Sequence, residues 1–88
     1  MKAVAILCTN IRRVRLARGW TQEATAERAG LPPRHFQDLE AGRRPGLRLA
    51  TIERIAKVLK VQVWELLQPG KFPEPERQRG RSGRRIKR

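Results

Sequence analysis

Aromatic side chains are scarce in this 88-residue chain, at 5% of the sequence, so a hydrophobic core must be built mostly from aliphatic residues. Hydrophobic residues still make up 39% of the chain, which allows one small packed domain. Regular alternation of apolar and polar residues over strand lengths is also rare, and this argues against a sheet-rich fold. The composition and its patterning therefore predict a compact all-α domain.

Cysteine and histidine occur once each, as Cys8 and His35. One cysteine cannot form an intrachain disulfide, which fits a reducing compartment. Its apolar surroundings predict a buried, inert thiol, with an intermolecular disulfide as the alternative. A lone histidine has no partners for a metal or catalytic site, and no catalytic triad, paired-carboxylate site or phosphate-binding glycine loop stands out. We therefore expect no enzyme activity, no metal and no cofactor.

Long hydrophobic runs are missing as well. The apolar run near the start, Ala3 to Cys8, is too short for a secretory signal, and Leu7 stands where a lipoprotein signal needs a small residue. No segment approaches the length of a membrane span. The sequence thus predicts neither a signal peptide nor a membrane partner, and a cytoplasmic location.

Acidic residues are few, at 8 against 21 Lys and Arg, and the formal net charge is +13. Such a field attracts polyanions, which include DNA, RNA and acidic membrane surfaces. Arginine that merely covers solvated surfaces is the alternative, and it explains part of the excess but not easily all of it.

The apolar residues that are present repeat at helical spacing, and proline and glycine separate the repeats. Thr21 is a good N-cap for one of these segments. From residue 70 the chain has almost no apolar content, with eight basic and two acidic residues, and this predicts a disordered basic tail over 70–88. The folded domain is then 1–69, with helices expected over about 3–18, 22–29, 33–41, 50–60 and 63–68.

The stretch TQEATAERAGLPPRHFQDLEAG contains two short helices broken by Gly30-Leu31-Pro32-Pro33, which predicts a helix-turn-helix. In that motif the second helix lies in the DNA major groove. Arg34 can reach guanine, Gln37 can pair with adenine, and Asp38 can accept from cytosine. A merely solvated helix face is the alternative, which the turn and the basic flanks disfavour.

The segments IRRVRLARGWTQEATAERAGL, FQDLEAG and TIERIAKVLKV resemble the Cro/lambda-repressor-type helix-turn-helix regulators, also called the XRE family. The resemblance spans about residues 7–67. It implies a compact five-helix lambda-repressor-like domain that binds operator DNA, usually as a homodimer. The chain departs from the family pattern where Thr25 replaces a leucine, where Pro32 replaces a Ser or Thr cap, and in a loop after Gly42 that is one residue longer.

The resemblance also implies residue roles. Arg15 and Glu40 match a pair that forms an internal salt bridge between the first and third helices. Pro33 could only make an apolar contact with a base. The DNA contacts expected from the motif and the resemblance together are base edges for Pro33, Arg34, Gln37 and Asp38, and backbone phosphates for Thr21, Gln22, His35, Arg43 and Arg44.

Trp64 stands where the resemblance implies a polar residue, so it either folds back onto the core or joins Val63 and Leu67 in a dimer surface. A dimer would place two recognition helices about 34 Å apart and favour a palindromic operator. The Arg-rich tail is either a flexible polycation that strengthens non-specific binding or an arm for an AT-rich minor groove, and its weak motif favours the first.

The function expected is a sequence-specific transcriptional repressor or autoregulator, encoded by a bacterium or phage, associated with the nucleoid, and acting on double-stranded operator DNA. An antitoxin that also binds a protein toxin is an alternative on the same fold. Two further alternatives are a protein-interaction adaptor without DNA sequence preference and an RNA binder that uses the basic tail.

Overall fold

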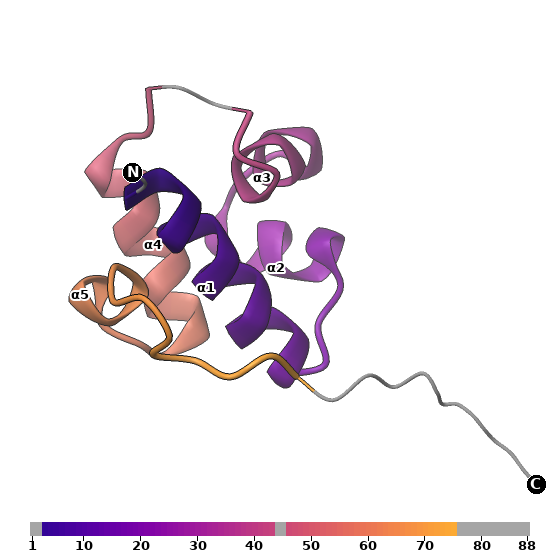
Figure 1. Cartoon of the computed structure of the whole chain (residues 1–88). Coiled ribbons are helices and arrows are strands. Elements are labelled where there is room, and N and C mark those ends of the chain that lie inside the picture. Colours follow the sequence, from indigo (N-terminus) through magenta and orange to yellow (C-terminus); the bar gives the residue numbers. More distant parts are fainter. Residues whose placement is uncertain (1–2, 44–45, 76–88) are drawn as a thin grey trace, which may run out of the picture.

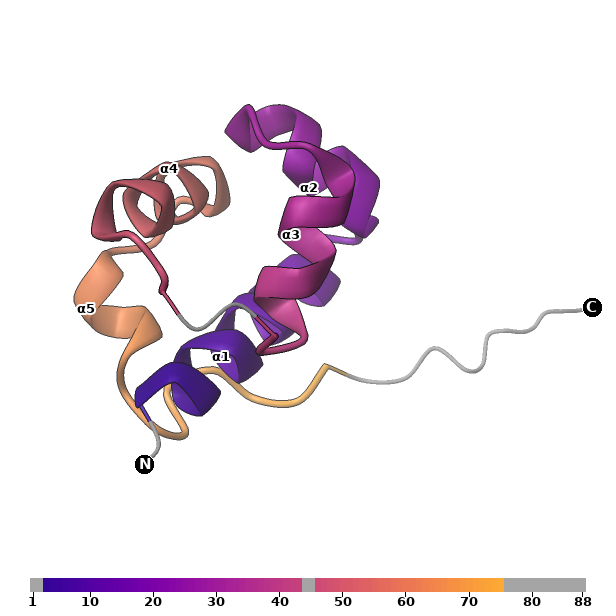
Figure 2. The same cartoon turned by 90° about the horizontal axis from the view of Figure 1, so that it is seen from above.

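The computed structural model describes residues 3–43 and 46–75, and within these ranges the chain is all-helical. Helix α2 packs against both α3 and α4, and α1 runs across the domain against α3 and α5 (Figures 1 and 2). The expectation of an all-α domain of five helices is confirmed, and the ends differ from the expected ones by at most two residues. The helices are α1 (Ala3–Ala17), α2 (Gln22–Ala29), α3 (Pro33–Glu40), α4 (Leu49–Leu59) and α5 (Val63–Leu66).

Helix ends follow local chemistry in most places. The Thr21 hydroxyl accepts a hydrogen bond from the Ala24 backbone N–H at 3.0 Å, which satisfies one free donor of α2. The end of α4 is different, because Lys60 adopts a left-handed conformation with φ 63°. A residue with a Cβ atom is strained there by roughly 1–2 kcal/mol. Two backbone hydrogen bonds hold the turn, from the Lys60 N–H to the Lys57 carbonyl at 3.1 Å and from the Val61 N–H to the Ala56 carbonyl at 3.0 Å. The sequence has no glycine at this turn from which the helix end could be predicted.

The core is aliphatic around one aromatic ring, as the composition predicts. Phe36 of α3 is fully buried, and the inner faces of α1 and α4 surround it with the expected helical stripes. The core residues of these two helices are Leu7, Ile11 and Val14 of α1 and Ile52, Ile55, Ala56 and Leu59 of α4.

Thr25 is fully buried although it is polar. Its hydroxyl donates to the Thr21 carbonyl oxygen at 2.9 Å, so the buried donor is satisfied. Trp20 is partly buried against the core, and the Arg28 guanidinium lies 4.3 Å from the centre of the Trp20 ring. The threonine that stands where the resemblance implies leucine is therefore accommodated in the core without an unsatisfied donor.

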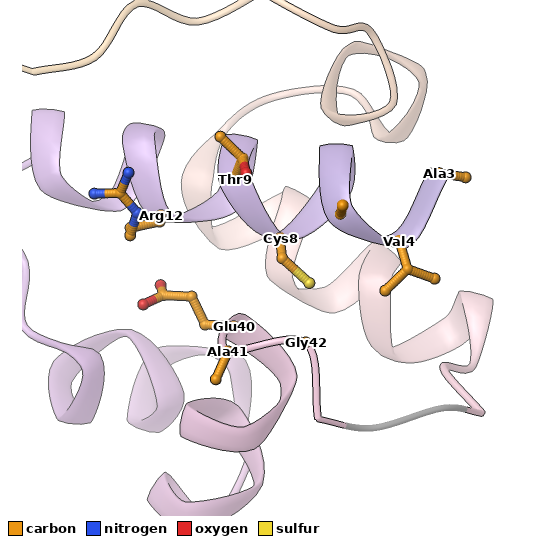
Figure 3. Close-up of a pocket in the computed structure, with 9 residues that line it drawn as sticks. Ala3, Val4, Cys8, Thr9, Arg12, Glu40, Ala41 and Gly42 are labelled. Atoms are coloured by element: carbon orange, nitrogen blue, oxygen red, sulfur yellow. The ribbon is translucent and has the colours of Figure 1, made fainter. Parts of the chain in front are cut away.

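Cys8 is a buried free thiol that donates to the Leu39 carbonyl oxygen at 3.1 Å. Burial raises the pKa of the Cys8 thiol, and the nearby Glu40 carboxylate raises it further, so little reactive thiolate forms. Figure 3 shows that Cys8 of α1 and the end of α3 together line a pocket of about 670 Å³. The prediction of a buried thiol is confirmed.

The segment after α5 corrects one expected boundary. Residues 70–75, named the strap here, lie against α1 instead of leaving the domain at residue 69 (Figure 1). Phe72 packs partly against the core, and its carbonyl accepts from the Arg13 guanidinium at 3.0 Å. The Glu74 carboxylate pairs with Arg12 at 3.2 Å and with Arg13 at 3.0 Å. Desolvation alone would raise the pKa of Glu74, but these two arginines lower it below its usual value.

The rest of the expected tail, residues 76–88, lies outside the described residues. Its disorder and its two alternative roles therefore stay predictions. Within the described part of the chain, no helix has both the length and the apolar character that crossing a membrane requires.

Candidate nucleic-acid interface

The turn between α2 and α3 is fixed by glycine geometry and two backbone hydrogen bonds. Gly30 has φ +73°, its N–H donates to the Glu27 carbonyl at 3.1 Å, and the Leu31 N–H donates to the Ala26 carbonyl at 2.9 Å. This pair of bonds is a Schellman motif, which ends a helix and turns the chain sharply. Leu31 is buried directly after it, so the turn sets the angle at which α3 begins.

Helix α3 divides cleanly into a buried and an exposed face. Phe36 and Leu39 are fully buried, and Glu40 is also buried. The Arg34 side chain on the other face is 83% exposed. Pro33 is also exposed and Gln37 is half-buried. The residues expected to contact bases therefore share the outer side of the helix whose inner side anchors the core.

Asp38 is less free than the sequence suggests. Its carboxylate pairs with Arg43 at 3.3 Å and, more distantly, with Arg34 at 3.9 Å. The Arg43 backbone N–H also donates to the Asp38 carbonyl at 2.8 Å. Asp38, which is expected to contact a base, thus forms an ion pair with Arg43, which is expected to contact a phosphate. Exposed pairs of this kind contribute about 0–1 kcal/mol, so DNA could separate them at little cost.

Glu40 joins three helices through one buried carboxylate. Arg15 of α1 donates from Nε to Oε2 at 2.7 Å and from Nη2 to Oε1 at 3.0 Å. Gln22 of α2 donates from Nε2 to Oε1 at 2.7 Å. The salt bridge implied by the family resemblance is therefore present. Gln22 is a second partner of Glu40 that no local pattern predicts.

The Gln22 contact uses part of what this side chain can donate. One N–H of its amide donates to Glu40, and the second N–H and the carbonyl oxygen stay available to other partners. The backbone N–H of Gln22 lies at the start of α2, where intrahelical acceptors are absent. A phosphate contact at Gln22 is therefore expected from the second amide N–H and from the backbone N–H.

The positive ends of α3 and α4 carry no side-chain cap. Neither Pro32 nor Arg48 forms a capping hydrogen bond, and neither helix has an acidic residue in its first turn. Free backbone N–H groups and the helix dipole favour anions at such ends. The Pro32 position confirms the weaker capping expected there.

The remaining expected phosphate contacts lie in different settings. Thr21 is exposed, and its hydroxyl oxygen is used by the α2 cap. His35 is half-buried and lines a cavity between α3 and α4 instead of standing free on the surface. Arg44 lies outside the described residues. Among the described residues, no group of His, Cys, Asp and Glu has an arrangement that could hold a metal ion.

Comparison with known families identifies the architecture. A family model described as a helix-turn-helix domain matches residues 7–67. The chain belongs to this helix-turn-helix domain family.

The helix-turn-helix domain also has a relative of known structure. The crystal structure of hypothetical transcription factor NHTF from Neisseria superposes with a TM-score of 0.75 at 33% sequence identity, covering 80% of this chain and 79% of that one. A protein named Neisseria hypothetical transcription factor, from Neisseria meningitidis serogroup B, is 35% identical over 65 residues. That alignment covers 74% of this chain and 60% of the relative, so the chain matches less than two thirds of the relative's length.

The exposed residues of α5 lie outside the two helices of the motif. Trp64 is 58% exposed, so the alternative in which it folds back onto the core is wrong. The Lys71 ammonium lies 5.9 Å from the centre of its ring. Leu67 is also exposed, while Val63 packs partly against the core of the helix-turn-helix domain.

Proposed function

We propose that this chain is a sequence-specific DNA-binding transcription regulator of the Cro/lambda-repressor type. The observation that carries the proposal is the outer face of α3, where Arg34 is 83% exposed while Phe36 behind it is fully buried. In a helix-turn-helix domain this second helix enters the major groove. Membership of the family, a relative named as a hypothetical transcription factor and the net charge of +13 all support DNA as the partner.

The proposed readout uses the outer residues of α3. Arg34 donates two hydrogen bonds to guanine, Gln37 pairs with adenine, and Asp38 accepts from cytosine. Pro33 offers only apolar contact, for instance with a thymine methyl group. Phosphates bind the backbone N–H groups at the start of α2 and the guanidinium of Arg43 once it leaves Asp38.

The proposed regulator is a homodimer that represses by covering a promoter in the bacterial cytoplasm. Exposed large apolar side chains mark partner surfaces, and Trp64 on α5 with Leu67 at its C-cap is such a pair. Two copies related by a twofold axis would place their α3 helices about 34 Å apart, one turn of DNA.

The proposal is tested by selecting random duplex DNA with the purified protein at physiological salt and sequencing the bound pool. We expect a palindromic consensus whose half-sites are about 10 base pairs apart, because two recognition helices must read equivalent groove faces. A consensus without twofold symmetry would contradict binding as a homodimer. A bound pool without enrichment of any sequence would contradict base reading, because the affinity would then come only from attraction to the DNA backbone.

Arg34→Ala is expected to lower affinity for the selected site by about 1–3 kcal/mol and to relax the preference at one base pair. The fold should persist, because the Arg34 side chain is exposed and its 3.9 Å contact with Asp38 is weak. Fluorescence anisotropy on the selected site and on single-base variants measures both effects.

Lys57→Ala is the matched control, since it removes one exposed positive charge from α4 rather than from α3. An equal loss of affinity for every DNA sequence in the Arg34 variant would contradict base reading by Arg34.

A further inference from the structure

A polar cavity of about 400 Å³ lies between the turn before α3 and the first half of α4. The groups that can donate hydrogen bonds into it are the side chains of His35, Arg48, Thr51 and Arg54. No aspartate or glutamate is among the described residues that line it. Its charge is therefore entirely positive, unlike the Asp38–Arg43 and Glu74–Arg12 regions, where carboxylates neutralise arginine.

Arg54 is held in place over the turn. One guanidinium nitrogen, Nη2, donates to the Gly30 carbonyl at 3.1 Å. A Cβ atom on Gly30 would lie 2.7 Å from the same nitrogen, so the absence of a side chain makes room for the guanidinium. Within residues 3–43 and 46–75, Arg54 and Arg48 form no ion pair with a carboxylate. Two arginines thus line one cavity, and most of their guanidinium N–H donors are not used by contacts among the described residues.

Three leucines form the apolar part of the wall. Leu31 and Leu39 are buried and Leu47 is partly buried against the core. Apolar surface next to charged donors lowers the competition from water, which strengthens a charge-assisted hydrogen bond. The volume also exceeds that of a single oxyanion, which leaves room for the substituent of an ester.

We propose that this cavity binds a phosphate group, with Arg48 and Arg54 pairing its oxygens and Thr51 and His35 donating beside them. The guanidinium fork matches phosphate geometry, and no carboxylate in the described wall repels it. The phosphate comes either from a free phosphorylated small molecule or from the backbone of bound DNA. Binding of a DNA phosphate rests on the proposed function, whereas binding of a free phosphorylated molecule does not.

The first test measures free phosphate without DNA. The full chain is melted in rising potassium phosphate and in potassium chloride of equal ionic strength, with tryptophan fluorescence as the signal. We expect a saturable rise of the melting temperature in phosphate only, because a ligand that binds the folded state stabilises it. Arg48→Gln should weaken the apparent phosphate affinity about tenfold, the loss of one charge-assisted contact.

Two further variants separate phosphate binding in the cavity from a general effect of lost positive charge. Arg54→Gln should weaken phosphate binding as well, but it also loses the bond to Gly30, so Arg48, which is exposed, carries the test. Lys57→Gln removes one exposed charge from the same helix outside the cavity and should leave phosphate binding unchanged. Equal stabilisation by chloride and phosphate, or equal losses in the Lys57 and Arg48 variants, would overturn the proposal.

The second test separates the two sources. If the phosphate belongs to DNA, Arg48→Gln should reduce the slope of log affinity against log salt by about one and free phosphate should compete with DNA. An unchanged slope with intact free-phosphate binding assigns the cavity to a small molecule. If the selection experiment enriches no DNA sequence, the proposed function is contradicted, but the melting experiment without DNA still tests phosphate binding in the cavity. Each proposal can therefore fail without the other.

Discussion

Glu40→Ala is expected to lower the free energy of unfolding by roughly 3–5 kcal/mol, because it leaves the Arg15 guanidinium buried without its partner. The side chains of Arg15 and Glu40 are only 9% and 4% exposed, so water cannot replace the lost contacts. Gln22 loses its acceptor in the same variant. Urea unfolding followed by tryptophan fluorescence measures the change.

Glu74→Gln is the matched control, because it also removes a carboxylate that pairs with arginine, but on the surface. Its unfolding midpoint should stay close to that of the parent chain. A double variant, Arg15→Met with Glu40→Leu, should recover most of the loss, since apolar residues can replace a buried ion pair. If the double variant is no more stable than Glu40→Ala, the unpaired charge is not the cause.

Phe36→Ala is expected to destabilise the domain by a similar amount, about 3–5 kcal/mol, through the cavity left in a closely packed core. Phe36 is fully buried and is the anchor of α3 to the rest of the domain. DNA affinity should fall together with the folded fraction, and saturating operator DNA should restore part of both. Thermal unfolding with and without DNA measures this coupling.

Leu16→Ala provides the comparison, since Leu16 is 40% exposed on α1 and leaves no buried cavity. It should change stability by no more than about 0.5 kcal/mol. A Phe36 variant as stable as the Leu16 variant would mean that α3 is anchored elsewhere.

The helices and the turn were predictable because their signals are local. Thr21 caps α2, Gly30 ends it and Pro33 begins α3, and each of these effects depends on only a few neighbouring residues. The inner stripe of α4 is equally local. The end of α4 at Lys60 was less evident, because a lysine and not a glycine adopts the positive φ there.

The features that the sequence did not reveal depend on residues far apart in the chain. The strap is held by contacts between Glu74 and Arg12 or Arg13, which are 62 and 61 positions away. Low apolar content predicts disorder, but it cannot count ion pairs with a distant helix. The Gln22–Glu40 bond and the wall of the Arg54 cavity likewise need the packing of α2, α3 and α4.

The sequence predicted which side of α3 is exposed but not the ion pairs that its residues form. The pattern of α3 correctly separates the exposed Arg34 from the buried Phe36. It does not show that Asp38 is tied to Arg43, because charge pairs between a helix and its following loop depend on the loop geometry. The roles of these residues on DNA remain predictions.

The division of α3 into two faces makes the helix suitable for reprogramming. A designer could exchange Pro33, Arg34 and Gln37 as a cassette while keeping Phe36 and Leu39, since the first group does not support the core. Asp38 would be the exception. A new residue there that lacks a carboxylate releases the Arg43 guanidinium, so a change of base preference at that position would also alter how the following loop meets the DNA backbone.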